Sequence, residues 1–290
     1  MKKKSNLLEN IIRSIFLILG LVTIGCVLLI TIYFVISGIP AIREIGLVDF
    51  LLGDTWASTA AEPKYGILPF ILTSIYGTVG AIVLGVPVGF LTAVYLAKLA
   101  PPKVKAIMGQ AVSMLAGIPS VVYGLVGMMV LVPGIRKVFG VPDGASLLAA
   151  MIVLAIMILP SIIKMSVTAL EAVPREYEDA SLALGATPEE TYFRVSVPAA
   201  KSGIAAAVVL GVGRAIGEAM AVMMVAGNAA NMPDSLFQSV RFLTTAVASE
   251  MSYSSGLQRQ ALFSIALVLF LFIMLINAVL NFFLKGEKSK

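Results

Sequence analysis

The feature that most constrains this chain is a series of long, almost uncharged apolar runs. Apolar residues make up 59% of the 290 residues and charged residues 13%, whereas a soluble protein averages about 45–50% and 25%. A helix that crosses a bilayer needs roughly 20 apolar residues. The runs predict an all-α polytopic membrane protein with six transmembrane helices, near residues 14–37, 67–97, 107–133, 146–170, 203–227 and 260–284.

Positive charge is distributed unevenly between these runs. If both termini are cytoplasmic, the inner segments carry fourteen Lys and Arg residues and the outer segments six, which satisfies the positive-inside rule. We therefore expect a multi-pass protein of the cell inner (plasma) membrane with both termini cytoplasmic. The expected parts are a cytoplasmic N-terminus 1–13, a transmembrane domain 14–284 with outer loops 38–66, 134–145 and 228–259 and a cytoplasmic loop 171–202, and a cytoplasmic tail 285–290.

Several classes of function lack the residues they need. The chain has no histidine, and its single cysteine, Cys26, lies inside the first expected span. Histidine catalysis, a thiol or histidine metal site and a disulfide framework are thereby excluded. No Gly-Lys-Ser/Thr phosphate loop is present, and basic residues do not cluster with aromatic ones outside the spans. We expect no metal, no cofactor, no enzymatic activity and no nucleic-acid partner for this chain.

Two outer loops, 38–66 and 228–259, are long enough to offer a docking surface to a soluble partner. The first contains the one tryptophan, Trp56. Tryptophan is enriched where a membrane meets water, so we expect Trp56 to anchor the loop at that interface.

The cytoplasmic loop begins with signals for a short helix. Pro174 suits the first turn of a helix, and the acidic residues Glu178 and Asp179 favour its positive end. Gly185 then ends this helix.

A second short helix is expected directly after the first. Thr187 can cap it, Pro188 suits its first position, and Glu190 completes a capping box. Two short helices joined at a bend, on the water side of a membrane protein, indicate a docking element.

The fifth expected span carries two charges at membrane depth. Arg214 and Glu218 are four residues apart, so a continuous helix would place them on one face and let them pair. Gly213 and Gly217 form a ridge of small residues that allows close helix packing. A charge at the bilayer centre costs about 2.5–3.5 kcal/mol on insertion scales, so partners or water are required.

Two readings of this pair remain open. It is either a structural ion pair that fixes helix packing or an oxyanion contact on a translocation path, because a guanidinium binds phosphate or sulfate in a bidentate way. In the second reading Glu218 would favour hydrogen phosphate, which retains an O–H donor, over sulfate.

The third expected span is interrupted in the same manner. Pro119 removes a helix hydrogen bond in mid-span and predicts a kink. The hydroxyl of Ser120 and a freed carbonyl could then face a cavity, although a packing kink with no ligand contact is an equal alternative.

Residues 178–185 (EDASLALG) followed by 195–198 (VSVP) resemble the cytoplasmic coupling loop of ABC importer permeases. In that family the loop sits in a groove of the ATPase subunit. The ATPase contacts implied by the resemblance are Glu178, Asp179, Ala180, Gly185 and Pro198. Asp179 stands where the family pattern has alanine, which affects that one contact.

The remaining spans resemble the phosphate permeases of the PstC type. The resemblance covers essentially the whole chain and is carried by residues 65–70 (YGILPF), 76–78 (YGT), 116–124 (AGIPSVVYG) and 211–220 (GVGRAIGEAM). It implies the type I importer (MetI-like) architecture, with Arg214, Glu218, Ser120 and Pro119 on the substrate path.

The resemblance also implies an assembly. The expected partners are a homologous sister permease, two ATPase subunits that hold ATP and magnesium, an extracytoplasmic phosphate-binding protein, and membrane lipid. Alternatives are the sister phosphate permease itself, a permease for sulfate or molybdate, a secondary anion transporter driven by an ion gradient, or a membrane scaffold or sensor.

Overall fold

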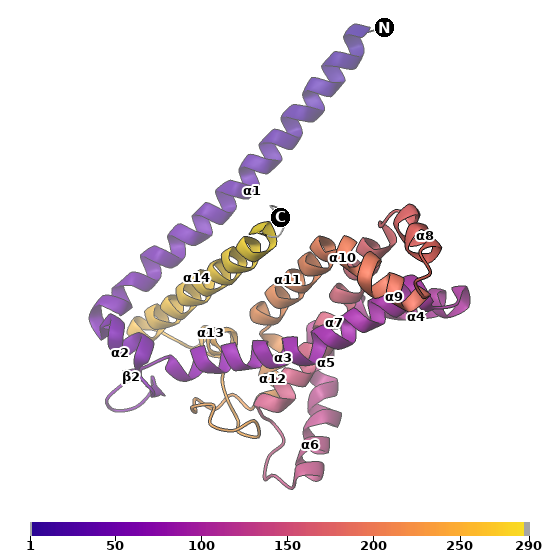
Figure 1. The fold of residues 1–290 in the computed structure, drawn as a ribbon. Helices are drawn as coiled ribbons and strands as arrows, with labels where there is room; N and C mark the ends of the chain where they lie inside the picture. The colour runs from indigo at the N-terminus through magenta and orange to yellow at the C-terminus, as the bar shows by residue number, and fades with distance from the viewer. Residues whose placement is uncertain (1, 287–290) are drawn as a thin grey trace.

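The computed structural model describes residues 2–286, and these residues are almost entirely helical (Figure 1). The predicted all-α class is confirmed. The elements are α1 (Lys2–Ile45), α2 (Leu47–Leu52), β1 (Trp56–Ala57), β2 (Lys64–Tyr65), α3 (Leu68–Val94), η1 (Tyr95–Leu99), α4 (Pro102–Gly117), α5 (Ser120–Val126), η2 (Gly127–Leu131), α6 (Val132–Phe139), α7 (Leu147–Glu171), α8 (Arg175–Ala183), α9 (Pro188–Thr191), η3 (Tyr192–Ser196), α10 (Val197–Ala199), α11 (Lys201–Gly217), α12 (Met220–Val225), α13 (Leu243–Glu250) and α14 (Gly256–Gly286).

Five helical segments of the described chain are long and apolar enough to cross a membrane. A sixth is obtained if Pro188–Ala199 and Lys201–Gly217, which meet at 71°, are counted as one bent span. The multi-pass architecture is therefore as predicted. The five single spans are Glu9–Ile45, Leu68–Leu99, Ser120–Phe139, Leu147–Glu171 and Gly256–Val279.

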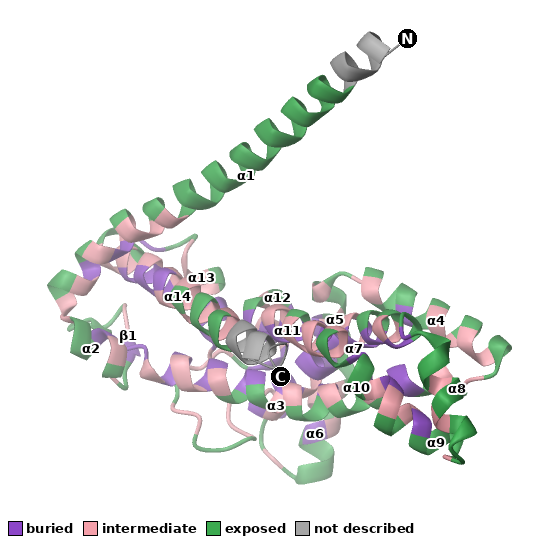
Figure 2. Ribbon diagram, turned by 45° about the horizontal axis from the view of Figure 1, so that its top comes forward, coloured by how far each residue is buried: buried purple, intermediate pink, exposed green. Residues whose placement is uncertain are grey.

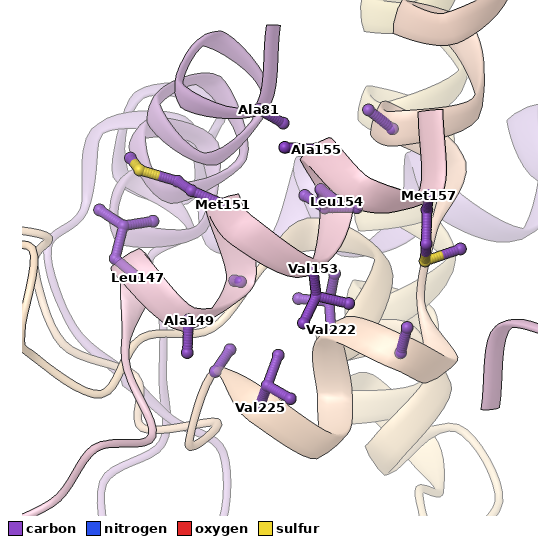
Figure 3. Close-up of a cluster of buried hydrophobic side chains, with 14 of the residues drawn as sticks. Ala81, Leu147, Ala149, Met151, Val153, Leu154, Ala155, Met157, Val222 and Val225 are labelled. Carbon is purple, nitrogen blue, oxygen red and sulfur yellow. The ribbon is translucent and has the colours of Figure 1, made fainter. Parts of the chain in front are cut away.

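Helix α7 is the centre of the bundle. Of the 18 residues in its most apolar stretch, 67% are buried, whereas none are buried in the corresponding stretch of α1. Helix α7 packs against α3 and α11, and the α3 glycines let the two helices approach closely: a Cβ at Gly85 would lie 2.9 Å from Ile158. Figure 3 shows α7 contributing most of the labelled buried side chains of this core, to which Ala81 of α3 and Val222 and Val225 of α12 also belong.

Helix α1 lies at the edge of the bundle. Its C-terminal part packs against α14, where the Ser264 hydroxyl donates a 2.6 Å hydrogen bond to the Gly38 carbonyl. Most of its remaining length projects away from the other helices and is exposed (Figures 1 and 2). An apolar helix with this exposure suits lipid or another membrane helix.

The third span differs from its expected bounds, 107–133. Helix α4 ends at Gly117, Ile118 and Pro119 are extended, and α5 begins at Ser120. Because a proline disfavours helical backbone in the residue before it, the chain breaks there instead of kinking. The spanning segment consequently runs from Ser120 to Phe139.

The expected outer loop 38–66 is largely structured. Helix α1 continues to Ile45, α2 follows, and β1 and β2 form a hairpin. Trp56 is 8% exposed and packs on Tyr65 and Phe70. The expectation that it is an interfacial anchor is wrong, because its ring belongs to a core shared with Leu243 and Ala246 of α13.

Candidate substrate path and coupling loop

The fifth expected span, residues 203–227, is broken at Glu218. Helix α11 ends at Gly217, Glu218 has extended backbone (φ −74°, ψ 130°), and α12 begins at Met220. The predicted Arg214–Glu218 ion pair requires an uninterrupted helix and is not formed. Instead, Oε1 of Glu218 accepts a 3.0 Å hydrogen bond from the Ala221 N–H. Glu218 thus satisfies an amide in the first turn of α12, as a capping side chain does.

Helix α13 contacts this break through a side-chain hydrogen bond. The Thr244 hydroxyl donates a 2.8 Å hydrogen bond to the backbone carbonyl of Glu218, a group that the end of α11 would otherwise leave without a helical partner. Thr244 is buried. The position of the break is therefore set by tertiary contact as well as by local sequence.

Arg214 lies half-buried in the last turn of α11, where the helix dipole favours a cation. Within the described part of the chain it has no hydrogen bond or ion pair. A partly buried guanidinium with five N–H donors and no acceptor at hand is a ready site for an anion.

The two breaks in the bundle lie close together. Helices α5 and α12, which begin directly after them, pack so tightly that a Cβ at Gly124 would lie 2.8 Å from the Ala221 Cα. The Tyr123 hydroxyl bridges the first break with a 2.7 Å hydrogen bond to the Leu115 carbonyl. Pro119 and Ser120 thus start a helix beside the second break, but no described hydrogen bond joins Ser120 to Arg214 or Glu218.

The glycine ridge on α11, formed by Gly213 and Gly217, has no close packing partner among the described residues of this chain. A Cβ at Gly213 or Gly217 would meet nothing within 4 Å in the described structure. The glycines that do pack on α7 are Gly203 and Gly211, where a Cβ would lie 2.4 Å from Ala169 and 3.1 Å from Ile162. At about 100° per residue, Gly213 and Gly217 point away from the face that Gly211 occupies. The open ridge is free for a second membrane helix.

The described cavities do not enclose Arg214. One of about 670 Å³ lies among α5, η2, α6 and α7 and has an almost wholly apolar lining that includes Val126, Leu131 and Ile152. Such a surface suits a lipid chain or an apolar helix and offers an anion no positive charge.

The loop 171–202, which was expected on the cytoplasmic side, has the local structure that its sequence predicts. Helix α8 begins directly after Pro174, and Gly185 ends it with a positive φ of 89°. Thr187 and Glu190 form the capping box of α9, with hydrogen bonds of 3.2 and 3.3 Å. Both predicted short helices and the bend between them are confirmed.

Glu178 is turned inward and fastens α8 to the membrane spans. It forms an ion pair with Lys98 of η1, and it accepts a 2.7 Å hydrogen bond from the Ser196 hydroxyl of η3. The two charged side chains are 10% and 16% exposed. Burial acts to raise the pKa of Glu178, but the hydrogen bonds from Lys98 and Ser196, with the charges of Lys98 and Arg175, outweigh it and hold that pKa below its ordinary value.

The other predicted loop residues face outward. Asp179, Ala180, Gly185 and Pro198 are exposed. The residue that the sequence analysis did not single out is Leu184, which is 90% exposed at the bend. The position of Leu184 directly before Gly185, the residue that ends α8, was the available signal.

A family model and several known proteins are similar to this chain over most of its length. The family model described as "Binding-protein-dependent transport system inner membrane component" matches residues 85–286. The chain is 39% identical over 273 residues to the "Probable ABC transporter permease protein YqgH" of Bacillus subtilis, which covers 91% of this chain and 88% of that protein. It is 34% identical over 283 residues to the "Phosphate transport system permease protein PstC" of Haemophilus influenzae (91% and 89% covered) and 35% identical over 242 residues to that of Pasteurella multocida (77% and 75%).

Solved structures share the fold. An inward-facing structure of the MetNI methionine ABC transporter superimposes with a TM-score of 0.56 at 20% identity, covering 76% of this chain and 94% of that one. An amino acid ABC transporter with histidines gives a TM-score of 0.54 at 20% identity, covering 76% and 92%. The predicted MetI-like architecture is confirmed by these likenesses. The chain therefore belongs to the family of binding-protein-dependent transport system inner membrane components, the permease subunits of ABC importers.

Proposed function

We propose that this chain is the permease subunit of an ATP-driven importer of inorganic phosphate and that Arg214 lies on the substrate path. The observation that carries the proposal is the half-buried guanidinium of Arg214, which ends a helix beside a break and has no hydrogen-bonding partner among the described residues. A charge is kept at such a place at a cost that a bound anion offsets.

The chemistry of the site favours a tetrahedral oxyanion. A guanidinium fork matches two phosphate oxygens at once. Because Glu218 is not paired with Arg214, the positive charge of Arg214 remains available to a passing anion. Two relatives with 34% and 35% identity carry the name "Phosphate transport system permease protein PstC", which supports phosphate in preference to other oxyanions.

Glu218 supplies selectivity in this proposal. One of its carboxylate oxygens is engaged by the Ala221 amide, while no hydrogen bond to the second is recorded in the described structure. An ionised carboxylate accepts hydrogen bonds, so it favours hydrogen phosphate, which has an O–H donor, over sulfate, which has none at neutral pH.

Exposed surfaces of the chain support the proposed assembly. The exposed face of α8 and the bend at Leu184 dock on one of two ATPase subunits, which hold ATP and magnesium. The open ridge at Gly213 and Gly217 faces a homologous sister permease. The outer segments receive phosphate from an extracytoplasmic binding protein, and both termini are cytoplasmic in the inner membrane.

Uptake of labelled phosphate and sulfate by vesicles that contain the full complex tests the proposal. We expect phosphate uptake that requires ATP and an active ATPase subunit, with little sulfate uptake. Uptake of sulfate in place of phosphate would identify sulfate as the substrate. Uptake without an active ATPase would favour a secondary anion transporter.

The selectivity role of Glu218 has its own test in the same vesicles. Glu218→Gln removes the charge but keeps an acceptor for the Ala221 amide, so α12 stays capped. We expect a reduced preference for phosphate over sulfate. An unchanged rate and an unchanged preference would remove Glu218 from the path.

A further inference from the structure

The two long outer segments meet in a polar cluster that the proposed path does not use. The Glu250 cluster consists of Glu250 at the end of α13 with Trp56, Ser58, Arg241 and Gln258. The Glu250 carboxylate accepts hydrogen bonds from the Trp56 indole (3.2 Å), the Gln258 amide (3.0 Å) and the Ser58 hydroxyl (3.4 Å), and forms an ion pair with Arg241. One carboxylate thus binds four donors.

These contacts join parts of the chain that are far apart in sequence. Trp56 and Glu250 are separated by 194 positions, so the carboxylate fastens the β1–β2 hairpin to the C-terminal end of α13. Arg241 also donates a 2.8 Å hydrogen bond to the Asn228 carbonyl and lies 5.8 Å from the centre of the Phe70 ring. The ion-paired side chains are 18% and 20% exposed, and charge-assisted bonds of this kind are stronger than those of open surface pairs.

The N-terminal end of α13 contacts the helix break at Glu218. Thr244 bonds the Glu218 carbonyl, and the Leu243 N–H donates a 3.0 Å hydrogen bond to the Ser74 hydroxyl of α3. Thr244 and Glu250 are six residues apart, a rise of about 9 Å along a helix. Leu243 and Ala246 of the same helix are buried in the core that includes Trp56. Helix α13 is therefore a short strut from the hairpin to the break.

We propose that Glu250 is a positioning residue that, through α13, ties the state of the outer hairpin to the break at Glu218. A soluble partner that moves the hairpin would shift α13 and with it the carbonyl that Thr244 holds. The transport consequence rests on the proposed function, but the mechanical link does not.

Hydrogen exchange of the assembled complex in lipid nanodiscs tests the link itself. Glu250→Ala removes the acceptor of all four donors, and we expect the amides of α12, beginning with Ala221, to exchange at least about threefold faster. Glu62→Gln, which removes an exposed carboxylate from the same hairpin, is the matched control and should change nothing. Faster exchange in residues 56–65 with unchanged exchange in α12 would overturn the inference.

A functional readout separates transmission from local damage. We expect Glu250→Ala, and Thr244→Val at the other end of α13, each to reduce the stimulation of ATP hydrolysis by phosphate-loaded binding protein at least about threefold, with basal hydrolysis unchanged. Thr244→Val with wild-type stimulation, beside a defective Glu250→Ala, would mean that the cluster acts on docking alone and would refute the strut. Failure of the wild-type complex to respond to phosphate would count against the proposed function, and the exchange result would still decide the link.

Discussion

The loop 171–202 and the helix break around Arg214 are both polar regions in an apolar chain, but they satisfy their polar groups in opposite ways. In the loop, Thr187 and Glu190 cap each other, and Glu178 is held by Lys98 and Ser196. At the break, the backbone is held by Thr244, while the Arg214 guanidinium has no hydrogen bond within residues 2–286. Under the proposed function, these polar groups of the loop are satisfied within this chain before it meets the ATPase, whereas the Arg214 guanidinium is satisfied by the anion that passes it.

Reversing the charge of Glu178 should produce the largest effect within the loop. Glu178→Lys places two cations together beneath α8, where the Lys98 side chain is 10% exposed, and removing one partner of a buried pair costs about 3–5 kcal/mol. We expect phosphate uptake to fall more than tenfold while the membrane spans remain folded.

The double variant Lys98→Glu with Glu178→Lys is the control for this prediction. Restoring opposite charges should recover a substantial part of the uptake if Glu178 acts by fastening α8. Failure to recover, with normal α8 structure, would indicate that Glu178 itself contacts the ATPase.

Substitution of Gly185 should have a smaller effect on the bend. Its φ of 89° is in a region that costs about 1–2 kcal/mol for a residue with a Cβ. Gly185→Ala should therefore destabilise the α8–α9 bend by about that amount, measured by hydrogen exchange of the Ala186 and Leu184 amides. Gly109→Ala, within helix α4 where a Cβ meets nothing within 4 Å, is the neutral control.

Loss of the α9 cap should cost slightly less. Thr187→Ala removes the acceptor of the Glu190 amide, and loss of such a cap costs about 1 kcal/mol. We expect faster exchange in residues 188–191 and weaker ATPase binding. Thr187→Ser keeps the hydroxyl and should behave as the wild type, and an equal loss in both variants would contradict the capping role.

Acidification should have the smallest effect of the series, and its direction follows from the lowered pKa of Glu178. A carboxylate with a depressed folded-state pKa contributes stability that is fully present above its ordinary pKa of 4.5 and is lost as the pH falls through the lower folded value. Protection of the α8 amides relative to their intrinsic exchange rate at each pH should therefore fall in that acid range in the wild type. In Glu178→Gln this relative protection should not change with pH in that range, and an equal loss of protection in both proteins would assign the effect to another group.

Prediction from sequence was best where the determinants are local. The caps and the bend of the loop were readable because Thr187 and Glu190 are three residues apart and Gly185 is the residue type that a positive φ favours. Pro119 likewise marked the break in the third span, although its sharpness was underestimated.

Prediction was poorest where a distant residue decides the local structure. Gly217 weakens the helix directly before Glu218, but the carbonyl at the break is held by Thr244, 26 positions away. The partner of Glu178 is 80 positions distant, and that of Trp56 is 194. Residue types alone do not specify such pairings, so the Arg214–Glu218 pair and the interfacial Trp56 were both predicted incorrectly.

The most direct test of the account is phosphate uptake by the full complex with Arg214→Gln, compared with Arg136→Gln, which removes an exposed arginine at the end of α6. A hydrogen bond to a charged group contributes about 1.5–3 kcal/mol, which corresponds to roughly 10–100-fold in rate. The account predicts a loss of this size for Arg214→Gln with assembly intact, and none for Arg136→Gln. Unchanged phosphate uptake in Arg214→Gln would contradict it and reduce Arg214 to a structural residue.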